Sequence, residues 1–374
     1  MTIVFAIVLV VHGLIHLLGV AKAFGMADLP RLTQPIPPSF GLLWLLAAAL
    51  CLVTAASLFV WTRGWWMVGV CALFISLLAV VSSWSDAKFG LVPNGVLLVG
   101  VVFGFLSQGP YSLRAEYDAD RARLLSTAAS EHTVTEVDLT RLPAVVQRYL
   151  RLSGAVGRPH VHNFRARMHG RIRSGPDARW MPLAAEQYNV VGEPARLFYM
   201  TASMLGMPVL GYHRYVGSAA SMRVKAAALL PVATAGGAEM TQSETVTLFN
   251  DMCVMAPATL IDRSIAWDTI DAHRVRARFS NAGFVIHADL WFSDSGELTN
   301  FVSDDRYQGS PDGATLRRVR WSTPVHGYRS FGAARLAAAG EGRWHEHGGE
   351  YAYIELTIDD VEYNVPDGED SDVD

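Results

Sequence analysis

Two histidines, His12 and His16, lie four residues apart in an apolar stretch, so one face of a helix would carry both. A polar pair inside hydrocarbon is costly, which makes it a candidate for metal or haem ligation or for proton transfer. The competing interpretation is structural, with hydrogen bonds to hydroxyl groups of neighbouring helices such as Thr54, Ser57 or Ser76. Because no second apolar stretch supplies a histidine or a mid-span acid, the sequence favours packing, and we expect no metal and no cofactor.

A second pair, His345 and His347, would share one face of a strand. Two histidines can hold a metal only if a third ligand arrives from elsewhere, and His287 or His326 would be candidates. Nothing in the sequence brings these residues together. We therefore expect a surface or interface role for the pair.

Arginines alternate along one strand face at Arg165, Arg167, Arg171 and Arg173, where they could bind phosphate headgroups. The chain has 28 arginines but only three lysines, so arginine clusters are weak evidence, and a solvated face with ion pairs is favoured. The acids of the segment 304–305 are expected to brace a loop. The chain has no nucleophile elbow, Walker loop, Cys-x-x-Cys pair or dinucleotide fingerprint. We therefore assign no catalytic residue and disfavour an enzyme.

Four apolar stretches in the first 107 residues must position the first histidine pair: Thr2–Ala21, Phe40–Trp61, Gly64–Trp84 and Phe89–Leu106. Each is long enough to cross a hydrocarbon core, which takes about 20 helical residues. Only six of the 66 charged side chains precede Pro110. The stretches therefore predict a bundle of four transmembrane helices.

The second half of the chain is patterned with period two from Val161 onward, which is typical of half-buried strands. About nine or ten such runs occur, and Ser293–Gly296 closes a hairpin. One helix interrupts them: Thr241–Glu244 resembles a capping box, and Val246, Phe249 and Cys253 follow on one face. The pattern predicts an α+β domain in which a curled antiparallel sheet packs on one or two helices.

These observations divide the chain into four parts. Residues 1–110 form the transmembrane bundle, 111–137 a helical connector, 138–365 the soluble half-barrel-like domain, and 366–374 an acidic tail. The tail is too polar and too acidic to pack, so we expect it to be disordered. Without the tail the chain is close to neutral, which argues against a nucleic-acid partner.

Several short motifs together resemble an uncharacterised bacterial family of multi-span membrane proteins that end in a domain of unknown function. They are Val11–Gly19, Gln147–Leu150, Ile265–Trp267, Asp305–Tyr307 and Val361–Asn364, with shorter landmarks at Leu142-Pro143, Phe164–Ala166, Gly342–Trp344 and Tyr351–Tyr353. The resemblance implies no reaction and transfers no site residues. The soluble half is also broadly similar to lipoprotein-carrier folds, half-barrels that shelter an acyl chain between sheet and helix.

The leading functional hypothesis is a binding module that holds an apolar ligand, a lipid or acyl chain, at the membrane surface. The expected lining residues are large apolar side chains on the alternating runs: Phe164, Met168, Phe198, Met200, Phe284, Trp291 and Trp321. Two alternatives remain open. One is a membrane oxidoreductase or proton-coupled enzyme that uses His12 and His16, and the other is a scaffold that binds a protein partner.

The bacterial resemblance places the four helices in the cytoplasmic membrane. Orientation depends on the basic residues near the first helix, because that helix usually dominates topology. Its nearby basic residues, Lys22 and Arg31, follow it, which favours an extracytoplasmic position for the soluble domain.

Overall fold

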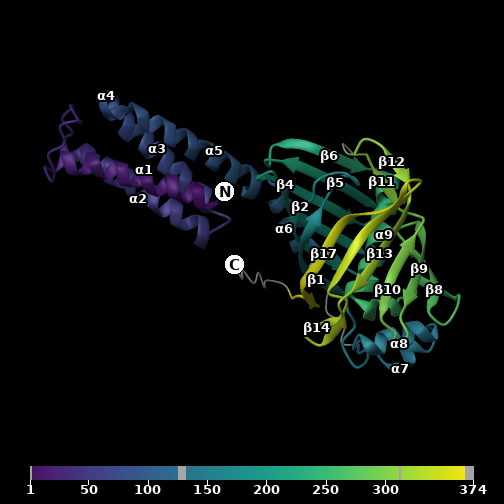
Figure 1. Cartoon of the computed structure of the whole chain (residues 1–374). Coiled ribbons are helices and arrows are strands. Elements are labelled where there is room, and N and C mark those ends of the chain that lie inside the picture. The colour runs from purple at the N-terminus through teal and green to yellow at the C-terminus, as the bar shows by residue number, and fades with distance from the viewer. Residues whose placement is uncertain (1, 125–131, 311–312, 367–374) are drawn as a thin grey trace. The chain divides into compact units, whose positions relative to one another are not determined.

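A computed structural model describes residues 2–124, 132–310 and 313–366 (Figure 1). The chain separates into two compact units, Met1–Glu116 and Tyr117–Asp374. The boundary predicted near residue 110 remains a prediction, and most of the predicted acidic tail lies outside the described residues.

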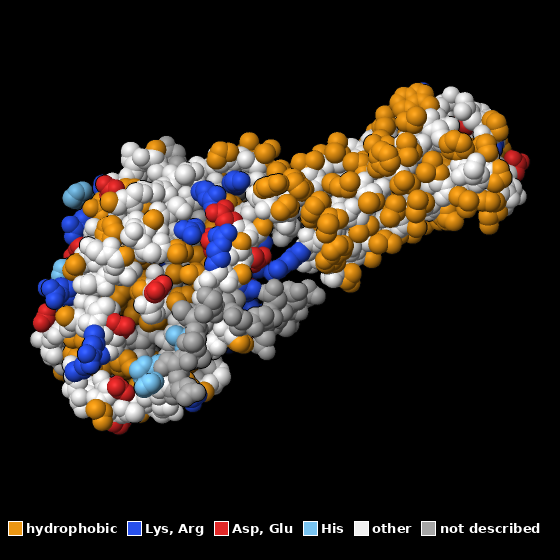
Figure 2. Space-filling view, turned by 180° about the vertical axis from the view of Figure 1, so that it is seen from behind, with side chains coloured by type: hydrophobic (Ala, Val, Ile, Leu, Met, Phe, Trp, Pro, Cys, Tyr) orange, Lys and Arg blue, Asp and Glu red, His pale blue; other side chains and the backbone are white. Residues whose placement is uncertain are grey.

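The first unit is helical, and four of its helical segments are long and apolar enough to cross a membrane. Its elements are α1 (Thr2–Ala23), α2 (Pro38–Val60), α3 (Trp65–Ser82), α4 (Trp84–Ala87), η1 (Lys88–Gly90) and α5 (Leu91–Gln108). Figure 2 shows apolar side chains over these helices on the face in view, as expected for a surface that contacts lipid. The predicted four-helix organisation is confirmed.

Small residues let these helices approach closely. A Cβ added at Gly19 would lie 2.3 Å from the Trp44 ring, and one added at Gly100 would lie 2.3 Å from the Phe5 ring. At Gly13, an added Cβ would lie 3.2 Å from the Cβ of Cys51 on α2. Such contacts between small and large residues are how helices pack where lipid supplies no hydrophobic driving force.

The second unit is a large antiparallel sheet domain. The helices are α6 (Leu113–Leu124, which spans the unit boundary), α7 (Glu136–Leu139), α8 (Ala144–Leu152), α9 (Ala238–Met255) and η2 (Pro257–Ile261). The strands are β1 (Asn163–Ile172), β2 (Met181–Val190), β3 (Ala195–Met204), β4 (Met207–Val216), β5 (Ala219–Ala226), β6 (Leu230–Gly236), β7 (Ile265–Thr269), β8 (Arg274–Asn281), β9 (Phe284–Phe292), β10 (Leu298–Ser303), β11 (Tyr307–Gly309), β12 (Leu316–Arg318), β13 (Arg320–His326), β14 (Arg329–Phe331), β15 (Ala334–Leu336), β16 (Ala339–Glu346) and β17 (Gly349–Tyr363).

Thirteen of these strands form one open sheet in the order β6-β5-β4-β3-β2-β1-β17-β16-β13-β10-β9-β8-β7. The predicted fold class is confirmed, but the predicted number of strands was too low, since the described residues contain 17. The strands that were missed include β6, which carries Pro231 and alanines, and β16, which is rich in glycine. Each has few of the β-branched and aromatic residues that mark strands in a sequence: β6 has Val232 and Thr234, and β16 has Trp344.

Helix α9 packs inside the curled sheet (Figure 1), and fifteen of its 18 residues are buried. Val246, Phe249 and Cys253 belong to the core, as predicted. The predicted capping box was wrong: the helix begins at Ala238, one turn before Thr241, and its N-cap is Gly237. Glu244 is therefore free of a capping role and accepts a hydrogen bond from Arg196 instead.

On the other face of the sheet, the arginines of β1 form ion pairs with acids of β17. Arg165 lies 2.8 Å from Glu362 and Arg171 lies 2.7 Å from Glu355. Most of these groups are partly exposed, so each pair contributes little to stability. The arginines of this face are engaged with protein carboxylates, which leaves little support for a phosphate-binding role.

Candidate functional site

A cavity of about 150 Å³ lies between α9 and the concave face of the sheet. Its wall comes from the middle of the sheet (β1, β2, β3, β4, β13, β16 and β17) and from α9. Part of the wall is apolar and includes Met168, Met200, Val254 and Met255, and another part is charged. The cavity therefore offers two different chemical environments to a bound molecule.

Four of the seven residues predicted to line a pocket do line this cavity: Met168, Phe198, Met200 and Trp321. The other three do not. Phe164 is fully buried in the core, and Phe284 is half-buried at the start of β9. Trp291 lies on the outer face, 37% exposed, with the Arg274 guanidinium 4.5 Å from its ring centroid.

The placement of Trp291 follows from strand geometry. Successive side chains of a strand alternate between faces, so residues seven apart, such as Phe284 and Trp291, cannot point the same way. Ile286, Ala288 and Leu290 are all buried on the inner face. Trp291 must then point outward, and the prediction overlooked this parity.

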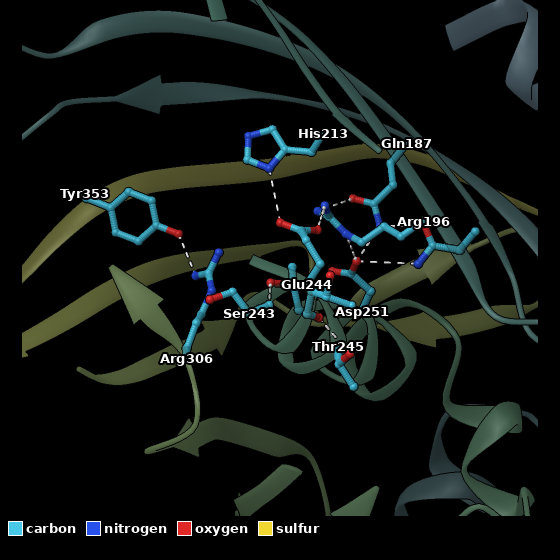
Figure 3. Close-up of polar contacts among 12 residues, drawn as sticks. Gln187, Arg196, His213, Ser243, Glu244, Thr245, Asp251, Arg306 and Tyr353 are labelled. Atoms are coloured by element: carbon cyan, nitrogen blue, oxygen red, sulfur yellow. Dashed lines mark hydrogen bonds and ion pairs between the residues drawn. The ribbon is translucent and has the colours of Figure 1, made fainter. Parts of the chain in front are cut away.

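The charged part of the wall is a buried network centred on Arg196 of β3 (Figure 3). Its Nη1 donates to Glu244 at 2.9 Å, and its Nε donates to Asp251 at 2.6 Å. Gln187 of β2 donates to Asp251 at 2.7 Å. The side chains of Arg196 and Glu244 are 7% and 1% exposed, so solvent screens this pair only weakly.

His213 of β4 extends the network, because its Nδ1 lies 3.2 Å from Glu244. Burial alone would raise the pKa of Glu244, but Arg196 and His213 hold it down at about 2. Burial also raises the pKa of Asp251, and Arg196, which is shared between two carboxylates, does not offset this. Glu244 is thus the firmly ionised partner of Arg196.

Arg306, in the segment between β10 and β11, lies beside this network (Figure 3). Its Nη1 donates to the Tyr353 hydroxyl at 2.9 Å, and its guanidinium lies 4.2 Å from the Trp321 ring centroid. This stacking on an aromatic face stabilises a cation without a carboxylate.

Several buried polar atoms of cavity-lining residues have no hydrogen-bond partner within the described part of the chain. They are Arg306 Nε, Trp321 Nε1, Asn250 Nδ2 and Thr323 Oγ1. A buried polar group without a partner costs about 1–3 kcal/mol, so several in one cavity indicate a place where a ligand or water completes the bonding.

The family model that matches the sequence covers residues 132–356, which is more than half of the chain and includes the whole cavity wall except parts of β17. The chain belongs to a family of unknown function, DUF6544. A search among curated proteins finds no match.

Three solved structures resemble this DUF6544 chain in fold. An outer membrane lipoprotein-sorting protein domain from Vibrio parahaemolyticus, named as putative, is 10% identical, with a TM-score of 0.32 over 54% of this chain and 85% of that one. A DUF1329 family protein from Desulfovibrio piger is 8% identical, with a TM-score of 0.35 over 60% of this chain and 94% of that one. A LolA superfamily protein from Nitrosomonas europaea is 12% identical, with a TM-score of 0.33 over 60% and 96%.

Sequence reasoning missed the charged residues of the site, Arg196, Glu244 and Asp251. One signal could have found two of them. Glu244 and Asp251 are seven residues apart on one helix, so they lie about two turns apart on one face, in a stretch that also carries Val246, Phe249 and Cys253. Two acids on such a face require a buried cation, and Arg196 stands on a strand of buried residues.

The other candidate residues of the DUF6544 sequence have local partners. His345 Nε2 lies 2.8 Å from Ser322 Oγ, and its Nδ1 lies 3.3 Å from Glu350. His287 and Arg318 both contact Asp305, which braces the loop after β10 as predicted. In the described ranges, one group of His, Cys or acidic side chains is close enough to hold a metal, and it lies in the helical unit: His12, His16 and Cys51.

The low pKa of Glu244 predicts that part of the stability of this domain is sensitive to acid. A carboxyl with a lowered pKa stabilises the fold above its unfolded value of about 4.5, and this contribution is lost as the pH falls towards about 2. The stability advantage of wild type over Glu244→Gln should therefore shrink between these values, by about 3 kcal/mol. Thermal unfolding followed by circular dichroism from pH 7 to pH 2 would measure it. Glu355→Gln, which removes a partly exposed ion pair, should show little such dependence; equal pH profiles for the two variants would contradict the prediction.

Proposed function

We propose that the sheet domain binds an amphipathic ligand, a lipid or a free acyl chain, in the cavity under α9 and beside the membrane that holds α1, α2, α3 and α5. The observation that carries the proposal is the divided wall of the cavity. Methionines and Val254 form an apolar part of the wall, and residues that carry buried, unpartnered polar atoms belong to the same wall. An amphipathic molecule satisfies both parts at once.

The apolar part of the ligand has a size limit that flexible side chains can extend. A dry cavity of about 150 Å³ accepts a molecule as large as benzene. Met168, Met200 and Met255 all line the wall, and methionine side chains rearrange easily around different shapes. The end of an acyl chain therefore fits the cavity as it stands, and a longer segment would require the methionines to move.

The chemistry of the polar end of the ligand follows from N–H donors on wall residues that have no hydrogen-bond partner among the described residues. Arg306 Nε, Trp321 Nε1 and Asn250 Nδ2 are all N–H groups and can only donate. Arg196 is already neutralised by Glu244 and Asp251, so it does not compete for an anion. The fitting group is one that offers acceptor oxygens, such as a carboxylate or an ester.

The test is photo-crosslinking of the full-length protein in bacterial membranes with a diazirine-bearing fatty acid, followed by peptide mapping. Label is expected on peptides of β1, β3 and α9. It should fall at least tenfold in Met200→Glu, because a charge would enter the apolar wall. Thr201→Glu is the matched control, since Thr201 is the next residue on β3 and is exposed on the other face. Equal labelling of both variants, or label confined to the helical unit, would refute the proposal.

For the location of the domain, we propose the extracytoplasmic side of the bacterial cytoplasmic membrane, because Lys22 and Arg31 follow the first helix. Fusion of alkaline phosphatase or green fluorescent protein after Asn364 distinguishes the sides. Phosphatase activity without fluorescence is expected, and the reverse result would place the domain in the cytoplasm.

A further inference from the structure

Three metal-ligating side chains from two helices meet inside the helical unit. One imidazole nitrogen of His12, one of His16 and the sulfur of Cys51 all lie within 4.8 Å of one another. The three side chains are at most 2% exposed. The two histidines come from α1 and the cysteine comes from α2, so the cluster exists only because the two helices pack together.

One arrangement of protons is compatible with every contact of Ser76. In it, the Ser76 hydroxyl donates its one proton to Asn94 Oδ1 at 2.8 Å, and His12 Nε2 also lies 3.1 Å from that oxygen. The Ser76 oxygen can then only accept, and both histidine Nε2 atoms lie at hydrogen-bond distance from it, at 3.0 and 2.9 Å. In this arrangement each histidine is protonated on Nε2, since a neutral imidazole carries a single N–H.

This assignment leaves a lone pair on the Nδ1 of each histidine. Both Nδ1 atoms are buried and have no hydrogen-bond partner among the described residues. Histidines that served only to join helices would not need two buried, unpartnered acceptors. An Nε2–H held by a second group, with the other nitrogen free, is instead the arrangement that fixes a metal-binding imidazole.

We propose that His12 Nδ1, His16 Nδ1 and Cys51 Sγ bind a single Cu⁺ ion. Thiolate and imidazole are donors that suit copper and zinc. Cu⁺ with one thiolate and two neutral imidazoles has no net charge, whereas Zn²⁺ would leave one positive charge in the apolar interior, where an unpaired charge is costly. Binding releases the thiol proton of Cys51, so one proton leaves for each copper ion that enters.

The packing around the cluster supports a built site. Gly13, next to His12, leaves room for Cys51, because a Cβ there would lie 3.2 Å from the Cys51 Cβ. Trp44 contacts the other side of His16, with ring centroids 5.2 Å apart. Ser76 on α3 and Asn94 on α5 lie at hydrogen-bond distance from the histidines. All four long helices therefore contribute a residue to the cluster or its support.

The experiment uses the full-length protein in lipid nanodiscs under anaerobic, reducing conditions. Cu⁺ is offered in competition with the chromophoric chelator bicinchoninate, and the bound metal is examined by X-ray absorption. One copper ion per chain is expected, with two nitrogens and one sulfur in its shell. Cys51→Ser should weaken binding by more than about 100-fold, since even loss of a supporting residue costs 10–100-fold. Ser76→Ala, which removes only the support of the imidazoles, should cost about 10–100-fold.

Cys71→Ser is the matched control, because Cys71 is an exposed thiol on α3, and it should bind copper as wild type does. Circular dichroism of each variant checks that the helices are intact. The proposal is overturned if wild type binds no more copper than Cys51→Ser, if Cys71→Ser loses copper equally, or if zinc binds at this site and copper does not.

Discussion

Replacing Arg196 with methionine should destabilise the sheet domain by about 3–5 kcal/mol, because Glu244 and Asp251 would remain buried without the guanidinium that contacts both of them. Methionine keeps much of the volume of the arginine stem, so the loss reports on charge rather than on a hole. Hydrogen–deuterium exchange of peptides from β3 and α9 in the full-length protein measures the change in opening free energy.

Two comparisons separate the charge effect from a general cost of losing arginine. Arg171→Met removes an exposed ion pair with Glu355 and should cost no more than about 1 kcal/mol. The triple variant Arg196→Met, Glu244→Gln, Asp251→Asn should recover part of the loss, since no charge is then left unpaired. A loss equal to that of Arg171→Met would show that Arg196 does not neutralise the buried acids.

Substitution of Phe249 with alanine should cost about 3–5 kcal/mol, the range for an aromatic residue at the centre of a core. Phe249 is fully buried on the face of α9 that does not line the cavity. Its ring stacks on Phe279 with centroids 5.1 Å apart, and Phe301 lies 5.8 Å away. The same exchange measurement on α9 peptides applies.

Phe284→Ala is the matched comparison. Phe284 is half-buried at the start of β9, so its loss should cost no more than about 2 kcal/mol. Ligand labelling should survive in both variants at a temperature where the domain stays folded, because neither residue lines the cavity. If the two variants lose equal stability, Phe249 does not lie at the centre of the core.

The architecture could be predicted from the sequence because the hydrophobic pattern of whole helices and strands is visible in it. Twenty-residue apolar stretches mark the helices of the first unit, and the alternation along β9 and β10 gives those strands with the correct ends. Hydrophobic patterning follows burial, and the burial of apolar surface is the dominant favourable contribution to folding. The Ser76 partner of the two histidines was also among the alternatives that spacing suggested.

The site was harder because its members are distant in sequence. Arg196 and Asp251 are 55 residues apart, and His12 and Ser76 are 64 apart. No local pattern reports such a contact. Glu244 was misassigned for a related reason: Thr-x-x-Glu is a cap signal only at a helix start, and α9 begins a turn earlier at Ala238. In the sequence, Cys51 is one residue of an apolar stretch. Its position next to His12 and His16 results from the packing of α2 against α1.

The pairing of β1 with β17 sets the order in which the sheet can form during protein synthesis. Strands β1 to β6 form a meander of neighbours, and so do β7 to β10, so each half can pair as it is synthesised. The two halves are joined through β17, where Phe164 pairs with Tyr363, almost 200 residues later. The sheet therefore cannot be completed until the last strand has left the ribosome or the translocation channel. A message truncated before codon 349 would yield two unjoined half-sheets with exposed edges, which are ready substrates for proteases and chaperones.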